Sequence, residues 1–188
     1  MILETQNLIL REFEDKDAQA LVSGLSNINI AKFLVAFPFP FTKSDAKKFI
    51  KKTHKDSKQT PRTTYKLAIT QKNTLIGAIV LKEIDYTNLT CELGYWLSEE
   101  YWKKGLTTQA ARRIIKFAFE ELKLNKIIAK TITSNLASNN LIKKLGFSFE
   151  KMHPNSIKQK YSGKIFDGNT YWLEKEDWKK TNTLTQKK

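Results

Sequence analysis

Apolar and polar side chains follow regular periods along much of this chain. Tyr65, Leu67 and Ile69 alternate with a second set of smaller or polar side chains, which is the period-two pattern of a half-buried strand. A short polar turn then leads into another apolar run, which favours an antiparallel meander. Comparable patterns predict strands at residues 6–11, 65–70, 75–84, 90–97, 126–133, 147–151 and 170–174.

Helical periodicity is strongest at residues 108–122, where apolar side chains recur every three or four positions. They form one stripe, which consists of Ala111, Ile114, Ile115, Ala118 and Leu122. A second periodic segment, 136–145, is followed by Gly146, which suits a left-handed C-terminal cap. Shorter patterns predict two more helices, at 15–23 and 44–54.

The order of these elements predicts a mixed α+β fold with an antiparallel front half. Segments 90–97 and 126–133 are strands separated by one long helix, so we expect them to be parallel neighbours joined by a crossover. About seven strands and about four helices are expected in total. The length fits one domain, residues 1–178, followed by a polar, basic tail at 179–188 that we expect to be disordered.

The charge of the chain is strongly positive. It has 33 Lys and Arg residues against 19 Asp and Glu residues, a net charge of +14. Such a surface attracts polyanions, so a phosphate-rich ligand, RNA or a ribosome are natural partners. A lysine-rich surface that is merely solvated is the alternative.

Cysteine, histidine and hydropathy narrow the cellular setting. Cys91 is the only cysteine, so no internal disulfide can form, as is usual in a reducing compartment. His54 and His153 lie far apart without metal-site spacing, and we expect no metal. The start of the chain is too charged for a signal peptide, and the apolar stretch FLVAFPFPF is too short to span a membrane. We therefore expect a cytoplasmic protein that does not contact membranes.

The junction between the strand at 90–97 and the long helix reads SEEYWKKGLTT. The first N–H groups of a helix lack an internal partner and attract anions. Gly105 lets the loop turn these groups inward, Lys103 and Lys104 add charge, and Thr107 and Thr108 add hydroxyl groups. We interpret the junction as a diphosphate cradle, with a routine turn as the alternative. The spacing differs from a Walker loop and from a three-glycine dinucleotide motif.

Several motifs in order along the chain point to one family. They are TQNLILREFEDKDAQAL, FPFPFTKSDAKKFI, CELGYWLSEEYWKKGLTTQAARRIIKFAFEEL, TSNLASNNLIKKLGF and YWLEKEDW. Over about residues 3–178 the chain closely resembles the GNAT superfamily of N-acetyltransferases, and within it the Rim-type branch of ribosomal-protein and related enzymes. The resemblance implies an acyl-CoA N-acyltransferase fold: a strongly bent mixed sheet whose parallel pair is splayed apart to admit acetyl-CoA, the cosubstrate.

The resemblance also assigns cofactor contacts. The family loop wraps the CoA pyrophosphate with backbone amides, and the matching residues here are Trp102, Lys103, Lys104, Gly105, Leu106, Thr107 and Thr108. Thr107 departs from the usual Gly or Ala, so we expect a modified affinity. Asn135 matches a position that touches the pantetheine arm, and it also suits a helix N-cap. Asn140 and Lys143 are weaker cofactor candidates.

Acetyl transfer to an amine needs a base, a polarised thioester carbonyl and a proton for the departing thiolate. The resemblance places a catalytic glutamate at Glu92, for which a solvent-facing or lysine-paired side chain is the alternative. It assigns carbonyl polarisation to a backbone N–H near Leu97. Many relatives supply the proton from a tyrosine where this chain has Ile142. Ser138 matches the donor proposed in the Rim branch, and a tolerated polar residue in a first helical turn is the alternative.

The acceptor is expected beside an aromatic lip formed by Phe37, Phe39 and Phe41 and near Glu92, although packing of the lip onto the core is the alternative. The segment from Lys43 to Lys66 has nine basic residues against two acidic ones. This excess disfavours a free polycation and favours a protein N-terminus in acidic surroundings, as on a ribosome or near RNA.

The predicted function is acetyl-CoA-dependent N-acetylation of a primary amine, with a protein N-terminus as the favoured acceptor, by direct attack on the thioester. Two alternatives remain open at this point. One is a non-catalytic RNA- or ribosome-binding module on the same fold. The other is an acetyltransferase for small amines such as polyamines or antibiotics.

Overall fold

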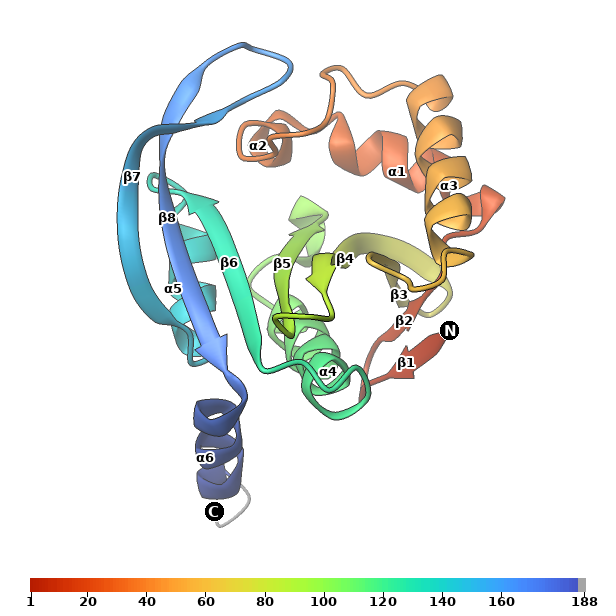
Figure 1. The fold of residues 1–188 in the computed structure, drawn as a ribbon. Helices are drawn as coiled ribbons and strands as arrows, with labels where there is room; N and C mark the ends of the chain where they lie inside the picture. The colour runs from red at the N-terminus through yellow and green to blue at the C-terminus, as the bar shows by residue number, and fades with distance from the viewer. Residues whose placement is uncertain (186–188) are drawn as a thin grey trace.

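Eight strands and six α-helices make up the part of the chain that the computed structural model describes, residues 1–185 (Figure 1). The strands are β1 (Ile2–Glu4), β2 (Ile9–Arg11), β3 (Tyr65–Gln71), β4 (Thr74–Asp85), β5 (Thr90–Leu97), β6 (Lys126–Ile132), β7 (Ser148–Lys158) and β8 (Ile165–Glu174). The helices are α1 (Ala18–Leu25), α2 (Ile28–Ala31), α3 (Lys43–Ser57), α4 (Leu106–Glu120), α5 (Leu136–Lys144) and α6 (Lys175–Thr185). Short 3-10 helices occupy Asp15–Asp17 and Glu99–Tyr101. The predicted mixed α+β class is confirmed.

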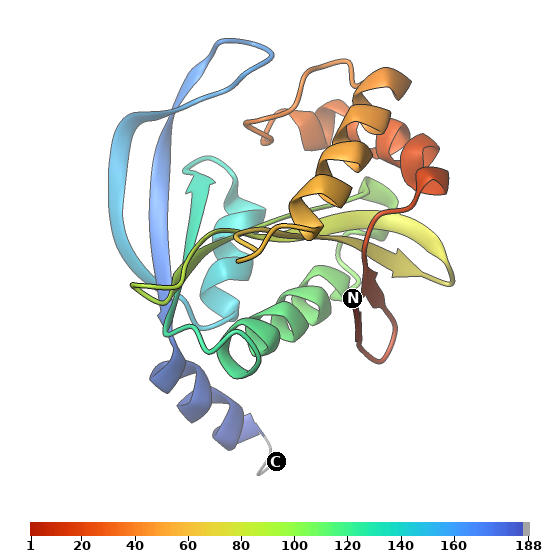
Figure 2. The same ribbon diagram turned by 45° about the vertical axis from the view of Figure 1, so that its right-hand side comes forward.

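All eight strands form one sheet in the order β1-β2-β3-β4-β5-β6-β8-β7. Neighbours are antiparallel except β5 and β6, which are parallel and joined by α4, as the crossover predicted. Figure 2 shows the β1–β5 part of the sheet and the β6–β8 part steeply inclined to each other. The sheet therefore has two halves that meet at the β5–β6 pair.

Each face of the sheet buries its own apolar cluster. Alternation along β5 places Leu93 and Leu97 in the cluster under α4, together with Ile114. Trp96 lies on the opposite face, in the cluster that α1 and α3 cover and that includes Ile50. By the same alternation, Glu92 and Gly94 lie on the face of Trp96. The Glu92 side chain therefore lies on the α1–α3 face of the sheet.

The helix ends follow the local sequence. Thr42 and Asp45 form a capping box at the start of α3, in which each side chain accepts from the other's backbone N–H. Gly146 follows α5 with φ of +93°, which confirms the predicted left-handed cap. The Asn135 side chain caps α5 by accepting from the Ser138 N–H, 3.2 Å away. These caps fix where α3 and α5 begin beside the sheet.

The structure differs from the expected elements at the edges of the sheet and at the C-terminus. β1 and α2 were not predicted, and α4 begins two residues before the expected start at residue 108. β7 and β8 are much longer than expected and form a hairpin that projects from the body (Figure 1). α6 continues to Thr185, within the tail for which disorder was expected, and residues 186–188 lie outside the described part. No helix within residues 1–185 is long and apolar enough to cross a membrane.

Candidate active site

β5 and β6 separate half-way along their length. Their parallel pairing runs from Thr90 opposite Lys126 to Leu93 opposite Ala129. β5 then continues to Leu97 while paired with β4, and β6 continues while paired with β8. Beyond Leu93 and Ala129, β5 stays paired with β4 and β6 stays paired with β8, but β5 and β6 no longer pair with each other. This is the splayed pair that the resemblance implied. The inner backbone groups at the end of β5 therefore face an opening between the two halves of the sheet.

The loop after β5 enters α4 through a left-handed residue. Gly105 has φ of +73° and ψ of 0°, a conformation that is costly for residues with a Cβ atom. Space is not the reason for glycine here, because a Cβ atom would meet no other atom within 4 Å. Lys103 also has a positive φ, +60°. The chain thus turns sharply twice immediately before the helix begins.

These turns leave a row of backbone donors free. In the described part of the chain, the N–H groups of residues 103–108 donate to no protein acceptor, and the first helical bond runs from Gln109 N–H to the Gly105 carbonyl, 3.1 Å. The row lies at the positive end of the α4 dipole. The Lys103 and Lys104 side chains are exposed, whereas Thr107 and Thr108 are half-buried and Leu106 is in the core. This geometry suits a diphosphate, held mainly by backbone groups.

Trp102 connects this loop to the end of β5. Its indole Nε1–H donates to the Leu97 carbonyl at 2.7 Å. The Ser98 N–H donates to the Ile76 carbonyl of β4, 2.8 Å away. Because N–H groups alternate in direction along a strand, the Leu97 N–H points the other way, into the opening. The Leu97 N–H, which the resemblance assigned to carbonyl polarisation, therefore does not take part in the β4–β5 ladder.

A tyrosine that sequence reasoning did not select lies beside Ser138. The Tyr95 hydroxyl of β5 is 2.9 Å from the Ser138 Oγ of α5, and either group can be the donor. Burial raises the pKa of Tyr95 to about 12, and the hydrogen bond with Ser138 offsets only part of that rise. Ile142, the position where relatives carry a tyrosine, is fully buried in the core. A phenol therefore reaches this region from β5 and not from α5.

The remaining cofactor candidates divide into two groups. Asn135 caps α5 and keeps its amide N–H groups for another partner. Asn140 and Lys143 are exposed on α5. Sequence reasoning overlooked Asn139, whose buried amide donates to the Asn135 carbonyl at 2.7 Å and accepts from the Tyr171 hydroxyl at 2.7 Å. Asn139 thus fixes the loop before α5 against β8.

Glu92 is buried and paired with two lysines. Its carboxylate oxygens lie 2.6 Å from Lys82 Nζ of β4 and 2.9 Å from Lys130 Nζ of β6. Burial alone would lower the pKa of Lys82, but the hydrogen bond and charge of Glu92 and the charge of Glu83 outweigh it and raise the pKa. The lysine-paired alternative named for Glu92 is thus the arrangement in this structure. The carboxylate joins the two halves of the sheet just before they separate.

The three phenylalanines of the predicted aromatic lip separate in the structure. Phe41 is 3% exposed and packs in the core cluster of the α1–α3 face, with Phe37 against it at a ring distance of 5.7 Å. Phe39 instead contacts Tyr161 in the turn between β7 and β8, at 5.4 Å. Core packing therefore corrects the expectation of a substrate contact for Phe41. Phe39 is the member of the set that reaches the second half of the sheet.

Comparison with known proteins identifies the family. Residues 7–148 match the model of the acetyltransferase (GNAT) domain. The chain belongs to the GNAT family. It is 30% identical to the "Uncharacterized N-acetyltransferase YnaD" of Bacillus subtilis (strain 168) over 184 residues, which cover 95% of this chain and 99% of that one. The chain is accordingly an N-acetyltransferase.

Two further relatives extend the comparison of this GNAT enzyme. The ribosomal-protein-serine acetyltransferase of Escherichia coli (strain K12) is 32% identical over 82 residues, which cover 44% of this chain and 46% of that one. A solved structure of the microcin C7 self-immunity acetyltransferase MccE, in complex with acetyl-CoA and AMP, has a TM-score of 0.79 at 24% identity. It covers 90% of this chain and 93% of that one. The second likeness is one of fold.

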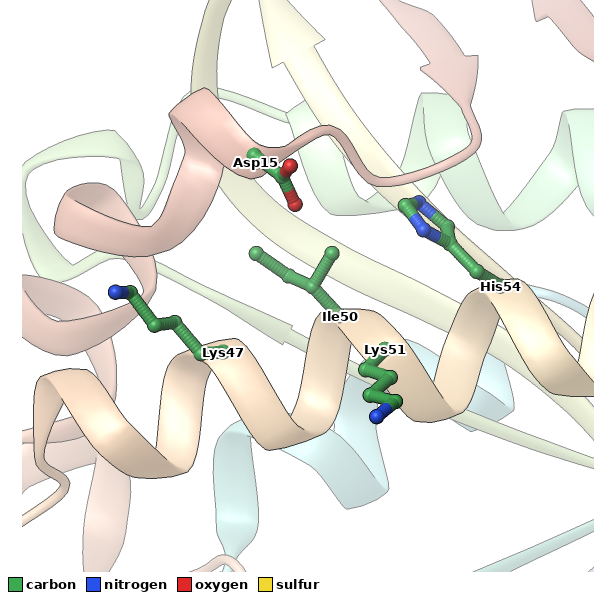
Figure 3. A pocket seen from close by; sticks show the side chains of 5 residues that line it. All are labelled: Asp15, Lys47, Ile50, Lys51 and His54. Atoms are coloured by element: carbon green, nitrogen blue, oxygen red, sulfur yellow. The ribbon is translucent and has the colours of Figure 1, made fainter.

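A cavity of about 570 Å³ lies away from the GNAT opening, against α3 (Figure 3). It is lined by Asp15, Lys47, Ile50, Lys51 and His54. His54 Nε2 lies 2.7 Å from the Phe13 carbonyl, so this ring nitrogen is already engaged. None of the five lining residues is a predicted catalytic or cofactor residue. This cavity is therefore distinct from the predicted catalytic and cofactor residues.

Proposed function

We propose that this GNAT enzyme transfers the acetyl group of acetyl-CoA to a primary amine at a protein or peptide N-terminus. The observation that carries the proposal is the separation of β5 from β6 directly beside the free N–H groups of residues 103–108. A cofactor in this opening has its diphosphate on the loop and its thioester beside the end of β5. The ribosomal-protein-serine acetyltransferase relative supports a protein N-terminus as acceptor, and the MccE structure in complex with acetyl-CoA supports acetyl-CoA as donor.

Backbone groups bind most of the cofactor in this proposal. Gly105 and its neighbours hold the diphosphate, and the Asn135 amide pairs with the peptide-like pantetheine arm. Asn140 and Lys143, exposed on the same helix, contribute outer contacts. The Leu97 N–H donates to the thioester oxygen, where negative charge develops as the amine attacks the carbonyl carbon. The C–N bond forms, the C–S bond breaks, and CoA leaves as a thiolate.

Ser138 and Tyr95 supply the proton for that thiolate. Ser138 lies in the first turn of α5, the Tyr95 hydroxyl behind it replaces the proton that the serine gives away, and solvent, which has taken the amine proton, returns one to Tyr95. The Tyr95 phenol stays neutral at every pH near neutrality because its pKa is about 12. A proton is therefore present on this pair throughout the working range. The pair takes the place of the tyrosine that relatives carry at position 142.

The contacts of Glu92 change the hypothesis for the base. Each Glu92 oxygen already holds an ammonium group, so an incoming amine must reach a remaining lone pair of the carboxylate between two positive charges. We propose that Glu92 holds Lys82 and Lys130 in place beside the acceptor and that solvent takes the amine proton. Direct general-base catalysis by Glu92 is the competing mechanism, in which a remaining lone pair of the carboxylate takes the amine proton.

The charges around the opening favour an acidic acceptor. Lys82 and Lys130 are 40% and 52% exposed beside Glu92, so their ammonium groups can also attract a carboxylate of the acceptor. On α3, only Lys52 has an acidic side chain within ion-pair distance among the described residues. The other lysines of that helix are Lys43, Lys47, Lys48, Lys51 and Lys55. We propose that they attract the acidic body of the acceptor protein, in place of the RNA contact considered from the sequence.

The test is release of free thiol from acetyl-CoA with matched acceptors. N-terminal peptides with acidic residues at positions two to four are expected to react faster than the same peptides with lysines there, and faster than spermidine. The difference should shrink as salt is raised from about 0.05 to 0.5 M, because exposed charges are screened. Equal rates for acidic and basic peptides would overturn the acceptor class. No thiol release with any amine would overturn the reaction itself.

A further inference from the structure

Gln159 is a buried polar residue in the turn between β7 and β8. Its side chain is 1% exposed, and its amide Nε2 lies 3.0 Å from the Ala31 carbonyl, 3.1 Å from the Lys32 carbonyl and 3.1 Å from the Leu34 carbonyl. These three carbonyls are at or just after the end of α2, where a helix leaves acceptors without intrahelical partners; the Ala31 carbonyl also accepts from the Leu34 N–H at 3.0 Å. One amide from more than a hundred residues away therefore caps this helix end.

The turn of the hairpin holds this amide in one orientation. The Gln159 Oε1 accepts from the Ser162 hydroxyl at 2.7 Å, so the other end of the amide must be the nitrogen that faces the three carbonyls. The Gln159 backbone donates to the Lys164 carbonyl and accepts from the Gly163 N–H. The side chain is thus positioned by its own turn before it meets α2.

Two more contacts join the same segments. The Lys160 N–H donates to the Val35 carbonyl at 2.9 Å, and the rings of Phe39 and Tyr161 are 5.4 Å apart. The segment after α2 is anchored on its other side by Phe41, which is buried in the core under α1 and α3. This stretch, residues 31–41, therefore spans from one half of the sheet to the hairpin of the other half. Figures 1 and 2 both show the hairpin tip reaching toward α2.

We call the contacts between residues 31–41 and the β7–β8 turn the bridge, and its position relative to the proposed active site matters. It connects the two halves of the sheet on the α1–α3 face, beyond the point where β5 and β6 stop pairing. The Glu92 side chain is on this face, whereas Tyr95 and Ser138 meet on the other. The bridge thus lies on the side from which the proposed mechanism brings the amine, and away from the cofactor loop at 103–108.

We propose that Gln159 is a positioning residue that latches the hairpin tip to the end of α2 and so fixes the width of the acceptor entrance. This role rests on the proposed function, because it assigns the α1–α3 face to the acceptor. With the latch closed, the entrance admits a narrow chain end. Without it, the two halves are free to move apart on this face, while the cofactor loop keeps its geometry.

The first test follows hydrogen exchange of residues 31–36 in wild type, Gln159→Ala and Gln159→Glu. Loss of the amide donor should speed exchange in this segment by about tenfold or more, since its hydrogen bonds are lost together. The glutamate keeps the shape of the side chain but turns an acceptor toward the three carbonyls, so it should have at least the same effect. Gln59→Ala, an exposed glutamine at the end of α3, is the matched control. Unchanged exchange in both Gln159 variants would overturn the latch.

The second test separates acceptor from cofactor. In Gln159→Ala the KM for an acceptor peptide should rise by about tenfold while the affinity for acetyl-CoA stays within about twofold of wild type. Preference for a peptide with glycine at its second position over the same peptide with tryptophan should narrow. An equal loss of acceptor and acetyl-CoA binding would mean general destabilisation and would overturn the positioning role. If wild type acetylates no amine, the proposed function fails, and the exchange result still decides the latch.

Discussion

The two faces of the opening between β5 and β6 present different kinds of chemical group: backbone groups on one face and side chains on the other. On the side that we propose for the cofactor, the groups in place are backbone N–H donors at residues 103–108 and at Leu97, with the Tyr95 and Ser138 hydroxyls behind them. On the side that we propose for the acceptor, they are side chains: the Glu92 carboxylate, its two lysines and the Gln159 amide. A backbone site depends on chain conformation, so many sequences can build it. A side-chain site changes with each substitution, so it is suited to setting which amine is accepted.

The largest expected effect comes from the hydroxyl pair proposed for the cofactor side, Ser138 and Tyr95. Ser138→Ala should lower turnover by about 10²-fold or more, and the double variant with Tyr95→Phe should cost little beyond that, because the two hydroxyls act as one donor. The affinity for acetyl-CoA should remain unchanged. Titration of Tyr95 should cause no rise or fall of the rate in the pH–rate profile, since its pKa is about 12.

Single-turnover rates and equilibrium titration of acetyl-CoA would check this prediction. A full-rate Ser138→Ala variant, measured with an acceptor for which the chemical step is limiting, would leave water as the proton donor.

The next test asks whether backbone conformation alone makes the cradle. Gly105→Val should weaken acetyl-CoA binding by about 5- to 150-fold, the equivalent of about 1–3 kcal/mol of strain at φ of +73°. Gly163→Val is the matched control, because Gly163 has φ of +67° and equally open surroundings but lies at the hairpin tip. Isothermal titration calorimetry should show a loss for the first variant only. Equal affinities in all three proteins would remove residues 103–108 from cofactor binding.

Glu92→Gln tests the acceptor side. If the carboxylate holds Lys82 and Lys130, its loss should raise the acceptor KM by about five- to tenfold, with a ratio to wild type that does not depend on pH. If it is the base, turnover should fall by about 10²–10⁴-fold at low pH and recover as the amine becomes neutral. Rates from about pH 6.5 to 9.5 span the titration of an N-terminal amine. Glu83→Gln, which changes an exposed carboxylate beside the same Lys82, is the control.

The smallest predicted effect concerns how α3 is fixed to the acceptor side. Burial alone would raise the pKa of Asp56, but the hydrogen bonds and charges of Lys66 and Lys52 outweigh it, and the pKa is lowered. A lowered pKa contributes stability that is complete above the unfolded value near pH 4 and is lost as pH falls through the folded value. Asp56→Asn should therefore cost about 1–2 kcal/mol at pH 7 and progressively less below about pH 4.

Denaturant unfolding of wild type and Asp56→Asn at pH 7 and at pH 3 would measure the difference in their free energies of unfolding. Lys52→Met should cost much less than Lys66→Met, because Lys52 is 68% exposed and lies 3.3 Å from Asp56, whereas Lys66 is 23% exposed and lies 2.7 Å away. A constant loss in Asp56→Asn from pH 3 to 7 would contradict the assigned sign.

Local sequence was sufficient where one face of an element is buried. The stripe on α4 and the alternation in β3 and β5 gave correct elements, and the parallel β5–β6 pair followed from their order. β7 is exposed along almost its whole length, so its sequence has no periodic apolar signal and only its first residues were predicted. β7 forms because it pairs with β8, and the sequence of β7 alone does not contain the information about that pairing.

The same distinction applies to the site. The loop at 103–108 could be predicted because its glycine, lysines and helix start are consecutive. Tyr95 and Ser138 are 43 residues apart, and Gln159 meets carbonyls 125 to 128 residues before it. Alternation along β5 places Tyr95 on the face opposite Glu92, and this was the only signal in the sequence that could have selected it. Gln159 had no signal at all, because its burial is created by α2.

The indole of Trp102 ties the loop that we propose for the diphosphate to the peptide group that ends β5. A shift of the loop when acetyl-CoA arrives would pull on the Leu97 carbonyl and, through the Leu97 Cα, turn the adjoining peptide plane, whose N–H is the one proposed to serve the thioester. The grip on the distant end of the cofactor and the alignment of its reacting end would then be one mechanical event. An acceptor that entered first would meet a peptide plane still out of alignment, so an ordered addition with acetyl-CoA leading is the kinetic signature of this single hydrogen bond.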